Sequence, residues 1–384
     1  MTGNLRDRLK RIQNLKKTET AVDILAAALK TRTPENSSFA DLTSLTEKGW
    51  IPCGFQVLKR EVLIDFPTKN FKKMPAALPI IIPDLAKKAS CCINDFIFFD
   101  LETTGLSGGA GTVAFLAAFG QFSPDGKLRV TQYLLLDYPG ENDFLEAVLV
   151  NFKIERSVIV SYNGKSFDSN ILKTRCLMNG IKPPEYTHAD LLHPARRLWK
   201  NIITDCSQSS IETQILGLDR KGDMPGSLAP DIWFEFLKTG GTDWLMGICD
   251  HNIRDITGLA SILCAMFSIA EDPFKAEKYN INFERLALRW RDIIRKSDRY
   301  LQLTNEGDGY EQYEELQLTG NNLLKYAADK GYKRAVYVYS FDQMRKGNYH
   351  EALDFARRGL KLFGEDTIWH EKLLRRIERL EKKI

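Results

Sequence analysis

The chain has 384 residues, of which 43% are hydrophobic and 27% are charged, and its formal net charge is +4. These values are ordinary for a soluble globular protein with room for two or three domains. The sequence has no run of about 18 apolar residues, and its seven cysteines include no CxxC pair. We therefore expect no membrane span, no zinc site and no disulfide framework, but a cytoplasmic protein with reduced thiols.

Residues 1–90 are predicted to form an irregular, partly basic amino-terminal extension. Its basic side chains gather at 6–17, a helix is expected over 22–30, and one or two strands are expected within 54–66. Positive charge of this kind is compatible with nucleic-acid binding. A solvated helix face is the alternative explanation, and the sequence leaves both open.

Residues 91–270 alternate between strand-like and helix-like segments. Three strands come first and are joined by tight turns, of which "SPDG" at 123–126 is the clearest. Strand–helix units then follow, and the segment up to residue 270 is helical. This order predicts an α/β domain with a mixed sheet and helices packed on it. Strands are expected at 95–102, 111–122, 127–138 and 157–163, helices at 142–153 and 166–180, and a strand that runs into a helix at 185–200.

Residues 271–384 are predicted to form an all-α domain. The segments 332–346 and 347–363 have the apolar spacing of a tetratricopeptide-type helix pair. About three such repeats are needed for a stable stack, so the helices expected over 283–301 and 319–331 would have to complete it. A plain helical bundle is the alternative.

Acidic side chains follow two apolar strands and recur on one helix. Asp100 and Glu102 end the first strand of the 91–270 domain and point to the same face, because side chains alternate along a strand. Asp168 follows a later strand after a glycine-containing turn. His251 and Asp255 lie at i and i+4, on one face of the last helix.

Several carboxylates are costly to hold together without cations. Two Mg²⁺ or Mn²⁺ ions would offset the repulsion, because hard divalent metals prefer oxygen ligands. Such a pair suits phosphodiester hydrolysis, in which one ion activates water and the other stabilises the leaving oxygen. His251 could then accept the proton of the water.

Taken in order, three segments resemble the motifs of the DEDD superfamily of 3′–5′ exonucleases, which have an RNase H-like fold. These segments are "FFDLETTGL", "SYNGKSFD" and "HNIRD". The segments "LSGGAGTVAFLAAFG", "DLLHPARRLWK" and "RKGDMPGSLAP", together with the helical tail, resemble more narrowly the YprB-like branch. That branch joins an RNase H-like domain, with helices on both faces of a mixed sheet, to a tetratricopeptide-like carboxyl-terminal segment.

The resemblance implies a role for each matching residue. The metal-ligand carboxylates would be Asp100, Glu102, Asp168 and Asp255, and His251 would be catalytic. The segment at Thr103 and Thr104 would meet the terminal nucleotide, and Asn163 and Phe167 would support the second motif or touch substrate.

The spacing of His251 departs from the superfamily pattern. The superfamily places either a histidine five residues or a tyrosine four residues before its last aspartate. His251 lies four residues before Asp255, at the tyrosine spacing. Two roles, proton acceptor and water-orienting group, therefore stay open for His251.

The function expected from the sequence is a metal-dependent nuclease. The preferred activity is 3′–5′ exonuclease cleavage of single-stranded DNA or RNA with two Mg²⁺ or Mn²⁺ ions. The helical tail would bind a protein partner or extend the substrate path. A structure-specific endonuclease and a nucleic-acid-binding scaffold without catalysis are the alternatives.

Overall fold

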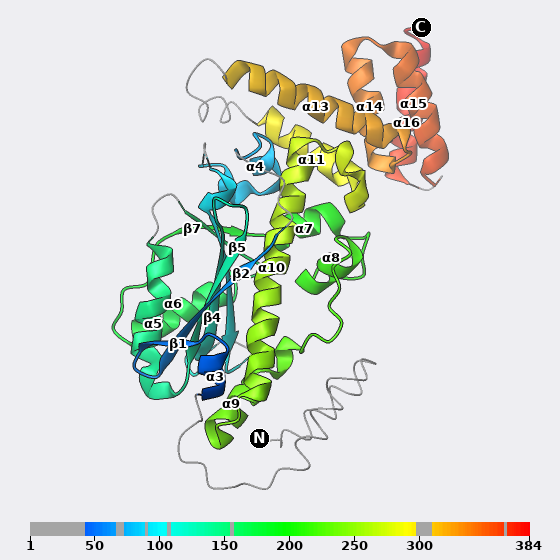
Figure 1. Ribbon diagram of the computed structural model, residues 1–384. Coiled ribbons are helices and arrows are strands. Elements are labelled where there is room, and N and C mark those ends of the chain that lie inside the picture. Colours follow the sequence, from blue (N-terminus) through cyan, green and yellow to red (C-terminus); the bar gives the residue numbers. More distant parts are fainter. Residues whose placement is uncertain are drawn as a thin grey trace. The chain divides into compact units, whose positions relative to one another are not determined.

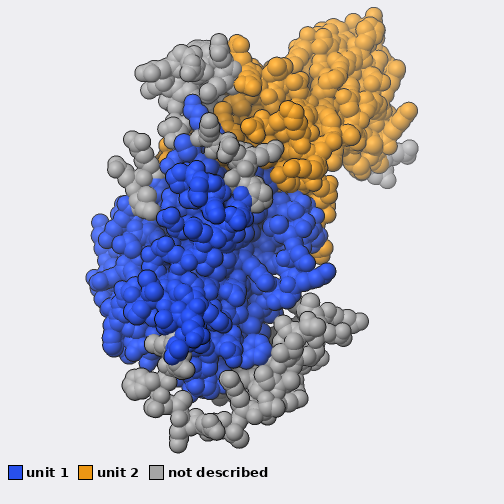
Figure 2. Space-filling view, viewed as in Figure 1, with its two compact units in different colours: residues 1–74, 90–192, 207–265 blue, residues 75–89, 193–206, 266–384 orange. Residues whose placement is uncertain are grey.

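The computed structural model describes residues 43–66, 73–88, 91–105, 109–153, 157–296, 309–364 and 367–384. The basic segment at 6–17 and the helix expected over 22–30 lie outside them. The chain divides into two compact units, coloured in Figure 2. The sheet unit comprises Met1–Met74, Ser90–Leu192 and Ser207–Ala265, and the helical unit comprises Pro75–Ala89, His193–Cys206 and Met266–Ile384.

The sheet unit is built on seven strands in the order β1-β2-β5-β4-β3-β6-β7. The pairs β3–β6 and β6–β7 are parallel, and the other four are antiparallel. The mixed sheet predicted from the sequence is confirmed. The strands are β1 (Ile51–Gly54), β2 (Val57–Ile64), β3 (Phe96–Thr103), β4 (Ala114–Phe122), β5 (Leu128–Leu135), β6 (Val158–Ser161) and β7 (Thr187–Asp190).

Two of these strands come from the part of the chain before residue 90. β1 and β2 form a hairpin, and β2 pairs with β5 along its whole length, from Val57 opposite Leu135 to Ile64 opposite Leu128. The amino-terminal segment therefore extends the sheet by two strands. The boundaries predicted at residues 90 and 270 stay predictions, because the two compact units alternate along the chain instead of dividing at single positions.

Apolar side chains cover both faces of the sheet. On the face covered by α5 and α6 (Figure 1), Phe99 stacks on Phe119, and both meet the edge of Phe152. On the opposite face, α10 lies so close to β4 that a Cβ atom on Gly120 would stand 2.4 Å from the Ile256 side chain. Glycine at this position therefore permits the contact between the helix and the sheet.

Helix α10 is the central helix of the sheet unit. Of the described helices, it alone is long and apolar enough to cross a membrane by length and composition, because an 18-residue window within it has a mean hydropathy of 1.5. Within the structure 61% of that window is buried, which is the burial expected of a helix packed on a sheet. The helices of this unit are α3 (Thr43–Glu47), α5 (Glu141–Leu149), α6 (Asp168–Met178), α8 (Gln208–Gln214), α9 (Ala229–Thr239) and α10 (Asp243–Glu271), whose last turns belong to the helical unit.

The carboxyl-terminal region is helical, as predicted. Helices α14 and α15 fold back on each other at Gly347, which has the left-handed φ of 84° that glycine adopts without strain. Ser340 Oγ donates a 2.8 Å hydrogen bond to the Ala352 carbonyl between them. The tetratricopeptide arrangement stays a prediction. The helices of this unit are α4 (Leu78–Ile81), most of α7 (Leu192–Trp199), α11 (Phe283–Arg295), α13 (Gly309–Asp329), α14 (Lys333–Lys346), α15 (Tyr349–Leu362) and α16 (Ile368–Glu381).

Candidate active site

The end of β3 faces the middle of α10 through polar side chains. Asp100 Oδ2 accepts a 2.7 Å hydrogen bond from Asn252 Nδ2 on α10. Two residues further along β3, Glu102 points to the same face, and its carboxylate lies within 4.8 Å of ligand atoms of His251 and Asp255. The strand repeat and the helix repeat thus place four side chains close together, as the sequence predicts. They are those of Asp100, Glu102, His251 and Asp255.

Asp168 joins the site from the amino-terminal end of α6. The turn before it is tight, because a Cβ atom on Gly164 would stand 2.3 Å from Ser161 Oγ and 2.9 Å from Asp168 Oδ2. Asn163, one residue earlier, has a left-handed φ of 65°. Glycine and asparagine suit these two positions, and they let the chain turn sharply enough to place Asp168 beside Asp100.

Burial and mutual repulsion raise the pKa of three of these carboxyls. The pKa of Asp100 is raised well above its usual value, first by burial and then by the charges of Asp255, Asp168 and Glu102. Burial, with the charges of Asp255 and Asp168, raises the pKa of Glu102 to about 8, although His251 opposes the shift. Burial, with Asp190, raises the pKa of Asp168 to about 7. Burial and the neighbouring carboxylates thus outweigh the interactions that favour the ionised forms, including that of His251 with Glu102.

Asp255 differs, because it already has cationic partners. Arg220 donates from Nη2 to Asp255 Oδ1 at 2.6 Å and from Nη1 to Asp223 Oδ2 at 2.8 Å, and its Nε donates to Glu212. Burial would raise the pKa of Asp255, but its contacts with His251 and Arg220 lower it. Arg220 is therefore a buried cation shared by three carboxylates, and it holds Asp255 in its ionised form.

His251 lies between two carboxylates. Its Nε2 is 3.2 Å from Asp255 Oδ2, and its Nδ1 is 3.1 Å from Asp223 Oδ2, an ion-pair contact that is not aligned as a hydrogen bond. Burial would lower the pKa of His251, but these carboxylates raise it to about 11. A Cβ atom on Gly226 would stand 2.8 Å from Nε2, so the backbone also confines the ring. The imidazole is held in place between two carboxylates that favour its protonated form.

A buried chain of hydrogen bonds supports Asp100 from behind. The amide of Asn252 that donates to Asp100 in turn accepts from Gln132 Nε2 at 2.9 Å. Gln132 Oε1 accepts from Arg60 Nη2 at 2.8 Å, and the guanidinium of Arg60 lies over the ring of Trp50. Asn252 and Gln132 are fully buried, so their amide groups fix each other's orientation in the core.

The residues expected to meet substrate have local partners in this structure. The Thr103 hydroxyl donates to the Gly105 carbonyl at 2.9 Å, and the Thr104 hydroxyl accepts from the Val113 amide at 2.9 Å. Both hydroxyls thus stabilise the loop that follows β3. Phe167 packs against the core beside Asp168, whereas Asn163 is exposed. Their contacts with substrate stay predictions.

Two further acids, Asp190 and Asp223, contact residues of the site. Asp190 accepts from the backbone amides of Asn163 and Lys165, at 2.8 and 3.0 Å, and so supports the second motif. Asp223 lies in the irregular segment before α9 and contacts Arg220 and His251, so it joins the cluster around Asp255.

Sequence reasoning missed several side chains that complete the site. The buried Gln132 offered one signal, since it interrupts the apolar face of β5 that carries Val130 and Leu134. Arg220 gave no signal, because it lies in an irregular segment between helices. The missed residues are Arg60, Gln132, Glu212, Arg220 and Asn252.

The donor set suits a hard divalent cation. Oxygen ligands from Asp100, Glu102, Asp168 and Asp255 are those that Mg²⁺ and Mn²⁺ prefer. The Glu102 carboxylate lies within 4.8 Å of ligand atoms of His251 and Asp255, and repulsion between the carboxylates raises the pKa of Asp100 and Glu102. The residues present therefore fit a metal ion of this kind.

Comparisons with known proteins agree with the fold. Residues 97–266 match a family model described as the RNase_H superfamily. The uncharacterized protein YprB of Bacillus subtilis (strain 168) is 40% identical over 176 residues, which cover 45% of this chain and 42% of that relative. The chain thus spans less than half of the relative's length.

A solved structure is also similar in part. It is the family B DNA polymerase from the hyperthermophilic archaeon Pyrobaculum calidifontis, with a TM-score of 0.35 and 14% sequence identity, covering 51% of this chain and 28% of that one. The family match and the mixed sheet are the observations that identify the fold. Residues 97–266 therefore form a domain with an RNase H-like fold.

Proposed function

We propose that the protein is a metal-dependent 3′–5′ exonuclease that acts on single-stranded DNA or RNA. The observation that carries this proposal is the convergence of four carboxylates from three elements of an RNase H-like domain. β3 supplies Asp100 and Glu102, α6 supplies Asp168, and α10 supplies Asp255. Burial and mutual repulsion raise the pKa of Asp100 and Glu102, and a divalent cation would relieve that repulsion.

Each residue has a role in this proposal. The four carboxylates hold Mg²⁺ or Mn²⁺. When bound, such ions activate water and stabilise the leaving oxygen of a phosphodiester. His251 is a hydrogen-bond donor in the described arrangement, because both of its nitrogens face carboxylates. It therefore orients water or a phosphate oxygen better than it accepts a proton.

The test is a time course on a 5′-labelled single strand, as DNA and as RNA. The wild-type chain with Mn²⁺ is compared with EDTA and with Asp100→Asn. The matched control is Asp243→Asn, which removes an exposed carboxylate from the first turn of α10. A ladder that shortens from the 3′ end, lost with EDTA and in Asp100→Asn but kept in the control, supports the proposal.

Other outcomes support other activities. Cleavage of circular single strands would contradict the exonuclease and favour a structure-specific endonuclease. If neither linear nor circular strands are cut, the chain would be a binding scaffold. The ion pair between Arg220 and Asp255 already partly neutralises the site, and this observation favours the scaffold over the endonuclease.

A further inference from the structure

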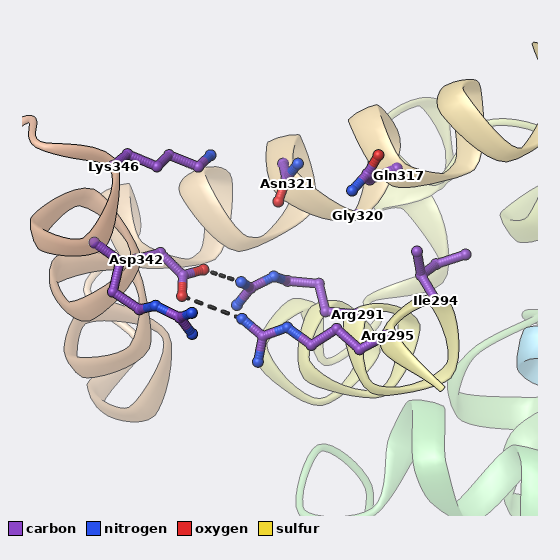
Figure 3. Close-up of a pocket in the computed structure, with 9 residues that line it drawn as sticks. Arg291, Ile294, Arg295, Gln317, Gly320, Asn321, Asp342 and Lys346 are labelled. Atoms are coloured by element: carbon purple, nitrogen blue, oxygen red, sulfur yellow. Dashed lines mark hydrogen bonds and ion pairs between the residues drawn. The ribbon is translucent and has the colours of Figure 1, made fainter. Parts of the chain in front are cut away.

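The helical unit contains a pocket that the proposed chemistry does not use. Its cavity volume is about 340 Å³, and α11, α13 and α14 line it (Figure 3). Four cationic side chains reach the pocket, and they are Arg291, Arg295, Arg345 and Lys346, with Asp342 as the one acid among the lining residues. The pocket thus carries three more positive than negative charges.

Asp342 does not neutralise the two arginines of α11. It pairs with the buried Arg291, and its Oδ1 lies 3.2 Å from Arg295 Nη2. One carboxylate is therefore shared by two guanidinium groups, as Figure 3 shows. Burial and the charge of Arg295 lower the pKa of Arg291 to about 10. This shift is what an incompletely compensated cation shows.

The two cations of α14 add further positive charge. Arg345 and Lys346 are exposed, and among the described residues no carboxylate lies within 4.0 Å of either one. The amide side chains of Gln317 and Asn321 on α13 face the same cavity (Figure 3). The pocket therefore offers guanidinium forks, an ammonium group and amide donors, which together suit an oxyanion with several acceptor atoms.

An aromatic side chain adjoins these cations. Phe341 is 39% exposed, and the Arg345 guanidinium carbon lies 6.0 Å from its ring centroid. Single-stranded nucleic acids bind where cations follow the backbone and aromatic or arginine planes offer stacking surfaces. An acidic peptide would use the cations alone.

We propose that this pocket binds a backbone phosphate of single-stranded nucleic acid, with the neighbouring base against Phe341 or Arg345. The choice of nucleic acid over an acidic peptide rests on the proposed nuclease function. The binding site itself does not, because all of its residues belong to the helical unit.

The experiment measures binding without cleavage. Fluorescence anisotropy of a labelled single strand is followed with the full chain carrying Asp100→Asn, in EDTA. The test variant adds Arg295→Gln and Arg345→Gln, which keep the buried Arg291–Asp342 pair. The matched control adds Arg357→Gln and Arg375→Gln, which remove the same charge from exposed positions on α15 and α16.

The expected result is a loss of affinity of about tenfold or more in the test variant and about twofold or less in the control. The slope of log K against log salt falls by about 1.4, because each contact with a single strand contributes about 0.7. Equal losses in both variants would overturn the proposal. If the test variant binds the strand as tightly as the wild-type site does, the proposal is overturned as well. The same holds if polyglutamate displaces the strand equally well from the test variant and from the protein with the intact pocket. Because no step depends on hydrolysis, failure of the nuclease proposal leaves this test intact.

Discussion

Asn252 on α10 donates a 2.7 Å hydrogen bond to Asp100 on β3, and Asn252 has no exposed surface. The bond joins the strand that ends in Asp100 to the helix that carries His251 and Asp255. The spacing between the two parts of the site therefore depends on a side chain that need not touch substrate.

Replacing Asn252 tests this connection. Asn252→Ala leaves Asp100 and Gln132 without their shared partner, and we expect the free energy of unfolding to fall by about 1–3 kcal/mol. Nuclease activity should fall by about tenfold or more, because Asp100 loses its orientation. Urea denaturation and the labelled-strand assay measure the two effects. Asn142→Ala, an exposed change on α5, is the control, and equal effects in both would refute the role of Asn252.

Arg220 is expected to be needed for stability as well as for the site. Arg220→Met leaves Glu212, Asp223 and Asp255 without their shared cation, and breaking a buried ion pair costs about 3–5 kcal/mol. Urea denaturation measures the loss. Adding Glu212→Gln should restore part of it, since one uncompensated charge is then removed. If Arg220→Met unfolds at the wild-type urea concentration, the network has no structural role.

Gly258 lies where α10 passes the Glu212 side chain. A Cβ atom on Gly258 would stand 1.7 Å from Glu212 Oε1, so Gly258→Ala must push the carboxylate away from Arg220. We expect a loss of about 1–3 kcal/mol, measured by thermal or urea denaturation. Gly111→Ala is the control, because nothing lies within 4 Å of its added methyl group. A Gly258→Ala protein as stable as the control would show that Glu212 can move freely.

The effect of metal on stability should depend on pH. The folded pKa values of about 8 for Glu102 and about 7 for Asp168 exceed the usual 4.5 and 3.8. Between these limits the folded chain binds more protons than the unfolded chain, so its stability in EDTA falls as pH rises. Mg²⁺ binds the ionised carboxylates, and its stabilising effect should therefore grow over the same range.

Thermal melts at about pH 5.5 and about pH 8.5, with EDTA or with excess Mg²⁺, check this expectation. The shift in Tm caused by Mg²⁺ should be larger at the higher pH. Asp100→Asn should raise Tm in EDTA, since it removes one of the repelling charges, and should reduce the Mg²⁺ shift. A Mg²⁺ shift independent of pH would contradict the proposed carboxylate ligands.

Local periodicity explains why the sequence predicts much of the site. Alternation along β3 puts Asp100 and Glu102 on one face of the strand. The helix repeat puts His251 and Asp255 on one face of α10, and this face lies against the end of β3. Both relationships involve residues close in sequence. Arg220 and Asp223 reach the same cluster from a segment without regular structure, so no periodic pattern places them.

The edge of the sheet was harder to predict for a related reason. Strand-forming residues were visible at 54–66, but their pairing with β5 joins positions that are 64 (Ile64 and Leu128) to 78 (Val57 and Leu135) residues apart. Such a long-range register depends on which sheet edge is free, and a single sequence does not show this. The helix pair α14–α15, in contrast, involves neighbouring segments, and its apolar pattern alone predicted both helices.

The pairing of β2 with β5 also determines which fragments of this chain can be prepared. A fragment beginning at residue 91 would keep all of the predicted catalytic residues but lose β1 and β2. The edge of β5 would then be open to aggregation, and Gln132 would lose Arg60, its partner on β2. An expression fragment of the RNase H-like domain should therefore begin before Thr43, even though the recognisable motifs start some fifty residues later.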